Sequence, residues 1–148
     1  MVDAAIAARA ERMSKKRARM LPLLAVIYLA QQVSYFSAAD HGRTVDHFKI
    51  GAWAVMSAVL LAALVTGGFW LRARELRDIV NDETSSAHRA DALGTGFVVA
   101  MITGIALYII GTATPVSDRE AIHAIVSLGI ASALVRFGWL ERRAMRGE

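Results

Sequence analysis

Apolar residues occupy the chain in four long runs, and charged residues collect between those runs. A helix of a soluble protein would instead scatter charge every three or four residues to keep one face wet. Runs of about 18 or more apolar residues are typical of helices that cross a bilayer. The pattern therefore predicts four membrane-spanning helices, at about 21–39, 50–71, 92–112 and 121–138.

Successive spans cross the bilayer in alternate directions, so helices that follow one another in the chain run antiparallel. Residues 21–140 are therefore predicted to form an all-α, antiparallel four-helix bundle in the membrane. Residues 1–20 form a basic leader, rich in alanine and arginine, that should be helical, and residues 141–148 form a basic tail. Pro22 is expected in the first helical turn of the first span, where its missing N–H has no partner to lose.

The basic residues predict the orientation of the bundle, because cytoplasmic loops carry an excess of lysine and arginine. Six precede the first span, four lie in the loop at 72–91 and four lie from residue 136 onward, fourteen of the 17 Lys and Arg residues. The other three, Arg43, Lys49 and Arg119, lie in the two remaining loops. Both termini and the middle loop are therefore expected in the cytoplasm, with the chain a multi-pass protein of a bacterial inner membrane.

Composition agrees with the membrane interpretation and removes several chemistries. Hydrophobic residues make up 55% of the 148 positions, charged residues make up 20%, and the mean hydropathy is +0.42. The net charge of +4 could indicate nucleic acid, but no compact basic domain is left once the spans are removed. We therefore expect the lipid bilayer, and no nucleic acid, as a partner. The chain contains no cysteine, which removes disulfides, thiol redox chemistry and thiolate metal sites.

The N-terminal part of the chain admits two alternatives. A basic leader, an apolar stretch and Ser37-Ala38-Ala39 loosely resemble a signal peptide with a small-residue cleavage site. The apolar stretch is longer than usual and contains Gln31 and Gln32, so a retained span is favoured. The leader either lies on anionic lipid or extends the first span, and its lack of large apolar anchors favours the extension.

The middle loop, RARELRDIVNDETSSAHRAD, is too charged for the bilayer yet rich in helix formers. Asn81 is a suitable helix N-cap, and Asp82 and Glu83 follow in the first turn, where helix N-termini favour negative charge. We expect the second span to continue as a helix to about Val80. The third helix should begin near Asp82, roughly two to three turns before it enters lipid.

Part of this loop resembles a pattern in small four-helix bacterial membrane proteins of uncharacterised function. The pattern covers about 25 residues here and comprises Leu76-Arg77-Asp78, Asn81-Asp82-Glu83-Thr84, His88-Arg89, Ala92 and Gly96-Phe97. The resemblance implies a small four-helix membrane protein with a cytoplasmic Asn-Asp-Glu turn motif. It implies no particular activity.

Four residues at the tip of this hairpin are the predicted binding site for a cytoplasmic protein partner: Asp82, Glu83, His88 and Arg89. They would offer both signs of charge outside the bilayer. The alternative is that they form a helix cap and a solvated charge cluster. Capping alone would account for Asn81, Asp82 and Glu83.

Histidine and aspartate recur on the opposite side of the membrane, where a metal could bind. The outer segments contain Asp40-His41, Asp46-His47, Asp118, Glu120 and His123. Imidazole suits zinc or copper, so His41, His47 and His123 are candidate metal ligands, although their spacing matches no compact metal motif. A haem between facing helices would have to use His123 and His41. A hydrogen bond to a neighbouring helix is the simpler role for His123, and we expect no resident cofactor.

Polar and small residues inside the spans indicate how the helices pack. Gln31 and Gln32 lie within the first span, where an amide must find a partner, so one of them should face the bundle or another subunit. Packing between helices is favoured over a substrate pathway for this pair. Small residues recur at four-residue spacing at Gly96-Ala100-Gly104 and at Ala54-Ala58-Ala62. Such ridges allow close approach of helices, within one bundle or between copies.

Missing features narrow the function. No Asp or Glu lies within a predicted span, which argues against a proton-coupled multidrug transporter. No Gly-rich phosphate loop, HExxH motif or nucleophile elbow is present. We therefore expect a non-enzymatic accessory or regulatory subunit that binds a protein partner, or another copy of itself, through its cytoplasmic face. The alternative is a small transporter, channel, or metal- or haem-binding protein that uses the outer His/Asp cluster.

Overall fold

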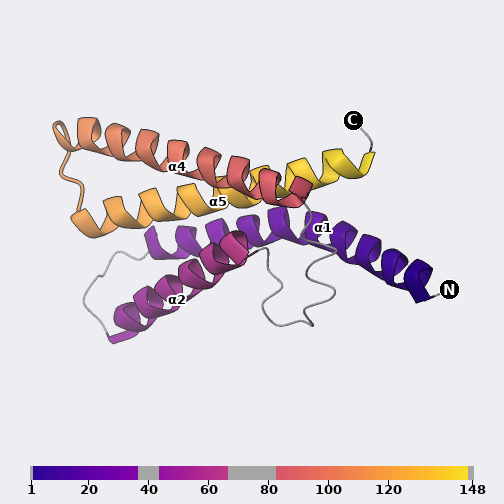
Figure 1. The fold of residues 1–148 in the computed structure, drawn as a ribbon. Helices are drawn as coiled ribbons and strands as arrows, with labels where there is room; N and C mark the ends of the chain where they lie inside the picture. Colours follow the sequence, from indigo (N-terminus) through magenta and orange to yellow (C-terminus); the bar gives the residue numbers. More distant parts are fainter. Residues whose placement is uncertain (1, 37–43, 67–82, 147–148) are drawn as a thin grey trace.

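A computed structural model describes residues 2–36, 44–66 and 83–146 of the chain (Figure 1). Within these ranges every regular element is a helix: α1 (Val2–Phe36), α2 (Thr44–Thr66), α4 (Glu83–Gly111) and α5 (Asp118–Arg146). The prediction of an all-α fold is confirmed for this part of the chain. α4 begins beside the predicted start at Asp82, and α5 continues as a helix through most of the predicted tail.

Three of the described helices are long and apolar enough to cross a membrane, over Phe48–Thr66, Thr84–Gly111 and Asp118–Arg146. These segments contain most of the second, third and fourth predicted spans. The first predicted span, 21–39, runs beyond the described end of α1 at Phe36 and stays a prediction. The predicted helical extension to Val80 and the cap at Asn81 lie outside the described residues.

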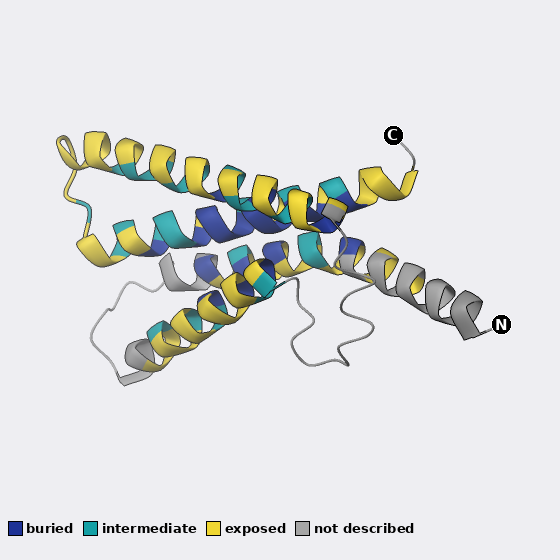
Figure 2. Cartoon of the chain, in the orientation of Figure 1, coloured by how far each residue is buried: buried dark blue, intermediate teal, exposed yellow. Residues whose placement is uncertain are grey.

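The described helices gather around α5. α1 and α4 each pack along α5, whereas α2 contacts α5 and α4 less extensively, and its first turns stand away from the other helices (Figure 1). The buried residues accordingly concentrate on α5, and most of α4 is exposed (Figure 2). α5 therefore forms the centre of the described structure.

Small residues bring α4 and α5 together. A Cβ placed on Gly96 would lie 2.7 Å from the Gly129 carbonyl oxygen and 2.8 Å from Ala133 Cβ, so no larger residue fits without a shift. The predicted packing role of the ridge that contains Gly96 is therefore confirmed. The ridge at Ala54-Ala58-Ala62 is exposed among the described residues, so its packing within the bundle or between copies stays a prediction.

α1 runs without interruption through Pro22, so the expectation that this proline starts a helix is wrong. A proline inside a helix cannot bond the carbonyl four residues earlier, which here belongs to Ala18. Arg142 of α5 donates its Nε–H to that oxygen at 3.0 Å. Gly138 makes room for the proline ring, because a Cβ there would lie 2.7 Å from Pro22 Cδ. The leader is thus part of the same continuous helix that enters the first predicted span, and α5 replaces the hydrogen bond that proline removes.

Candidate functional site

Polar side chains gather in two places on the described helices. The interior cluster joins α1, α2 and α5 and comprises Tyr28, Gln32, Trp53, Ser57, His123 and Ser127. The charged end lies where α4 begins and α5 ends, and comprises His88, Arg89, Asp91, Arg136, Glu141 and Arg142. The two clusters differ in burial and in chemistry.

The interior cluster begins with a hydrogen bond between α1 and α2. The hydroxyl groups of Tyr28 and Ser57 lie 2.6 Å apart, and both side chains are buried. Ser57 reaches this position because it shares one face of α2 with Leu60 and Leu64, which are also buried. A hydroxyl in an apolar interior is costly unless it is paired, so each of these two groups stabilises the other.

A second contact joins α2 to α5. Trp53 donates its indole N–H to Ser127 Oγ at 3.1 Å, and its ring stacks on the His123 ring with centroids 3.9 Å apart and planes at 20°. His123 and Ser127 lie four residues apart on α5, which places both beside the same indole. Both are buried, at 2% exposure each. Sequence reasoning missed this role of Trp53, because an indole near the end of a predicted span also suits the edge of a membrane.

Gln32 adds an amide to the interior cluster. Its Nε2–H₂ group donates to the Tyr28 carbonyl oxygen, one helical turn earlier, at 3.2 Å. Its buried Oε1 has no hydrogen-bond partner among the residues that the structure describes. Gln31 is exposed, so Gln32 is the member of the pair that faces the packed interior. The functional role of both glutamines stays a prediction.

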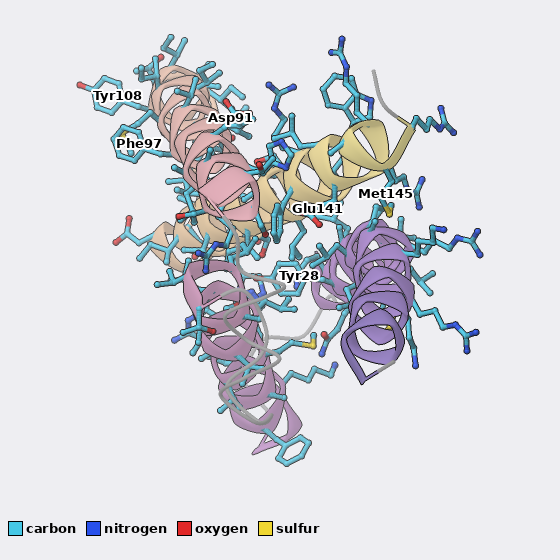
Figure 3. The ribbon with its side chains drawn as sticks, turned by 45° about the vertical axis from the view of Figure 1, so that its right-hand side comes forward. Tyr28, Asp91, Phe97, Tyr108, Glu141 and Met145 are labelled. Atoms are coloured by element: carbon cyan, nitrogen blue, oxygen red, sulfur yellow. The ribbon has the colours of Figure 1, made fainter. Side chains whose placement is uncertain are left out.

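The charged end contains a buried acid. Glu141 is 5% exposed and lies among the helices, and its Oε1 is 3.6 Å from His88 Nδ1 on α4 (Figure 3). At that distance a protonated imidazole forms an ion pair with the carboxylate. Sequence reasoning missed Glu141, because it placed this residue in a solvated tail rather than on a continuous helix.

A second ion pair joins α4 and α5 on the surface. The Arg136 Nε–H donates to Asp91 Oδ2 at 2.9 Å. The same guanidinium lies 5.1 Å from the Trp139 ring centroid, and that of Arg143 lies 5.5 Å from it. Both guanidinium groups are therefore close enough for the negative face of the Trp139 ring to attract their charge.

Two arginines of the charged end bind backbone carbonyls of other helices. Arg89 donates from Nη1 to the Val65 oxygen at 3.1 Å, near the end of α2. Arg142 donates to the Ala18 oxygen of α1. Cations suit these positions, because the last carbonyls of a helix, and one released by proline, lack partners within the helix. The charged end therefore ties α1, α2 and α4 to one another and to α5.

The predicted partner-binding residues fall partly within the described structure. His88 and Arg89 are half-buried and contact Glu141 and Val65 of the same chain. Asp82 lies outside the described residues, and Glu83 begins α4 with its side chain outside them. The docking role of these four residues stays a prediction, and His88 and Arg89 would have to serve it from positions already used in packing.

The predicted metal ligands are not all described. His41 lies outside the described residues, and His47 lies in α2 with its side chain outside them. His123 is buried, and its ring stacks on that of Trp53. Among the described side chains no group of three or more His, Asp or Glu residues could hold a metal. Near His123, Glu120 has a local role, since its carboxylate accepts the Ser117 backbone N–H at 3.2 Å, as in a capping box.

Comparisons with known proteins identify no relative of this chain. No protein-family model, no curated protein and no solved structure matches the chain. The function must therefore be inferred from the helices and their side chains.

Proposed function

We propose that the chain is a non-enzymatic accessory or regulatory subunit of a bacterial inner membrane, which binds a protein partner through its cytoplasmic face. In this proposal four antiparallel helices span the bilayer, and both termini lie in the cytoplasm. The distribution of charge along the sequence supports that orientation, since fourteen of the 17 basic residues lie in the leader, the middle loop and the C-terminal segment, which would share one side of the membrane. The resemblance of the middle loop to small bacterial four-helix membrane proteins agrees with it.

One observation carries the proposal: exposed cations concentrate at and beyond the charged end. On the described helices these are Arg12, Lys15, Lys16 and Arg19 of α1 and Arg142, Arg143 and Arg146 of α5. Toward the starts of α2 and α5 the exposed cations are Lys49 and Arg119. Most of the remaining described surface is apolar and suits lipid. Among the described residues, the exposed cations therefore favour the charged end as the surface that a protein would bind.

Fixed side chains at the charged end favour recognition of a partner. Arg142 is held on Ala18 O, Arg136 is held on Asp91, and Glu141 faces His88 between the helices. A surface whose charges are already ordered loses less conformational entropy on binding. The excess of cations favours a partner with an acidic face, and Asp82 and Glu83 would provide the opposite charge at the hairpin tip.

Co-purification of the tagged full-length chain from native membranes in mild detergent tests the proposal. Asp82→Ala combined with Glu83→Ala should reduce the stoichiometry of a co-purifying partner by about tenfold, the effect of losing a strong interface contact. Asp118→Ala is the matched control, because Asp118 is an exposed acid at the other end of the chain. An unchanged set of partners in the Asp82/Glu83 variant would contradict the docking site.

A second candidate function rests on the burial of His123. An ionisable side chain within a span is a candidate for ligand binding or transport. If His123 holds haem or a metal together with His41 or His47, the purified protein should show a Soret band or stoichiometric metal. Replacement of His123 by alanine should then remove it. A chromophore or metal that meets this test would favour the second candidate over the accessory subunit.

A further inference from the structure

An apolar groove follows the contact between α4 and α5 and is bordered by α2. Its volume is about 280 Å³, and every residue that lines it is apolar or glycine. α2 contributes Leu61 and Leu64 to the lining. Its lining also includes the small residues at the contact of α4 with α5, namely Gly96, Ala100, Gly129 and Ala133.

The groove is open between α2 and α4. These two helices contact each other only slightly, and the lining residues Leu61 and Phe97 are 46% and 63% exposed. Both helices carry segments that can span a membrane, so the groove would open onto hydrocarbon rather than water. Apolar cavities of about 150 Å³ already bind molecules the size of benzene. A groove of this size and lining suits a segment of an acyl chain.

Charge distinguishes the two ends of the groove. Arg89 lies one turn before the lining residue Leu93 on the same face of α4, and Arg136 lies one turn after the lining residue Ala133 on α5. Both arginines already have contacts, with Val65 O and with Asp91. Toward the other end the lining residue Ile125 also borders a second hollow, whose rim includes Asp118. An anionic group is therefore favoured at the Arg89 end.

We infer that this groove binds one acyl chain of an anionic glycerophospholipid, with the lipid phosphate at Arg89. Arginine suits this position because its fork of N–H donors can hold a backbone carbonyl and a phosphate oxygen together. A transmembrane helix from a second copy fits less well, because a helix is about 10 Å across and the groove has a volume of only about 280 Å³. The inference requires that the helices lie in a membrane, but it does not depend on the proposed cytoplasmic partner.

Native mass spectrometry of the purified full-length chain tests the site. The chain is titrated in detergent with phosphatidylglycerol and, separately, with phosphatidylcholine of the same acyl chains. We expect one tightly held lipid per chain and about fivefold stronger binding of phosphatidylglycerol, the factor that corresponds to about 1 kcal/mol for one cation near an anionic headgroup. Equal binding of the two lipids would overturn the inference.

Matched variants separate the acyl-chain contact from the headgroup contact. Leu61→Trp should fill the groove and lower the affinity for both lipids by about tenfold. Val59→Trp is the control, because Val59 is equally exposed (46%) but lies outside the lining, and it should leave both affinities unchanged. Arg89→Gln should remove the preference for phosphatidylglycerol while its amide can still donate to Val65 O. Arg143→Gln, which replaces an exposed cation of the same end, should preserve that preference.

The remaining outcomes are also decisive. If Leu61→Trp and Val59→Trp bind lipid equally well, the groove is not the site. If Leu61→Trp converts a dimer into a monomer and leaves the lipid count unchanged, a second copy occupies the groove and the lipid inference fails. Should Leu61→Trp lose its helical circular dichroism, the comparison of Arg89→Gln with Arg143→Gln decides independently.

Discussion

Helices α4 and α5 have the same length, 29 residues, but opposite environments. In the apolar segment of α5, 50% of the residues are buried, compared with 6% in that of α4 (Figure 2). The less buried segment is nevertheless the more apolar of the two. Tyr108 of α4 is 79% exposed and points away from the other helices (Figure 3). In a soluble protein the more apolar helix would be the buried one.

The more apolar helix is thus the more exposed one, and the behaviour of apolar side chains in lipid explains why. Lipid solvates apolar side chains as well as a protein interior does, so apolar character alone gives no reason to be buried. α5 occupies the centre because it supplies small contact surfaces and polar partners, including Gly129, Ser127 and Glu141. α4 exposes its larger apolar side chains, which hydrocarbon would solvate in a bilayer. Stability should therefore be sensitive to changes in α5 and tolerant of changes on the outer face of α4.

A glycine replacement should give the largest contrast between the two helices. Gly138→Leu on α5 would force a side chain into Pro22 and should destabilise the protein by about 2 to 3 kcal/mol. Gly94 on α4 has nothing within 4 Å of a Cβ placed there, so Gly94→Leu should change stability by less than about 0.5 kcal/mol. Reversible unfolding in mixed detergent measures both. Equal losses in the two variants would contradict the central role of α5.

The hydrogen bond from Arg142 to Ala18 O should give the next largest effect. Arg142→Met should cost about 1 to 2 kcal/mol in the natural sequence, because it leaves a carbonyl unpaired in a partly buried site. In a Pro22→Ala background the helix supplies its own N–H to that oxygen, so the same change should cost less than about 0.5 kcal/mol. A full loss in both backgrounds would show that Arg142 acts through other contacts.

The Tyr28–Ser57 pair in the interior cluster should be weaker. A double-mutant cycle with Tyr28→Phe and Ser57→Ala should give a coupling of about 0.6 kcal/mol, the average for polar contacts between helices in membranes. Folding measurements on the four proteins of the cycle determine it. Additive effects would mean that the two hydroxyls do not stabilise each other.

The surface pair of Arg136 and Asp91 should have the smallest effect. Their side chains are 37% and 49% exposed, and exposed ion pairs contribute about 0 to 1 kcal/mol. Asp91→Asn should therefore lower stability by less than about 0.5 kcal/mol at low salt, with the difference disappearing at high salt. A salt-independent loss would instead indicate that the α4–α5 contact depends on this carboxylate.

The sequence predicted the features that depend on local patterns. The helical leader, the start of α4 near Asp82 and the ridge that includes Gly96 follow from propensity, capping and spacing. The ridge at Ala54-Ala58-Ala62 has the same spacing but is exposed, because periodicity does not specify which neighbour a helix face meets.

Contacts between distant residues could not be predicted in the same way. Arg142 and Ala18 lie 124 positions apart, and Arg136 and Asp91 lie 45 apart. The residues around Ala18 do not show that its carbonyl needs an outside donor. That need follows only once Pro22 is known to lie inside the helix. Trp53 and Glu141 were missed for a similar reason, since a residue near a predicted span end can face either water or another helix.

Cysteine labelling of intact cells tests the orientation on which the functional account depends most directly. The natural chain has no cysteine, so single replacements report one position each. We chose Thr114→Cys in the exposed loop between α4 and α5, and Ser86→Cys and Ala144→Cys on exposed surfaces near the charged end. The account predicts that a membrane-impermeant maleimide labels Thr114→Cys in intact cells and labels the other two only after permeabilisation. Labelling of Ser86→Cys or Ala144→Cys in intact cells would contradict it.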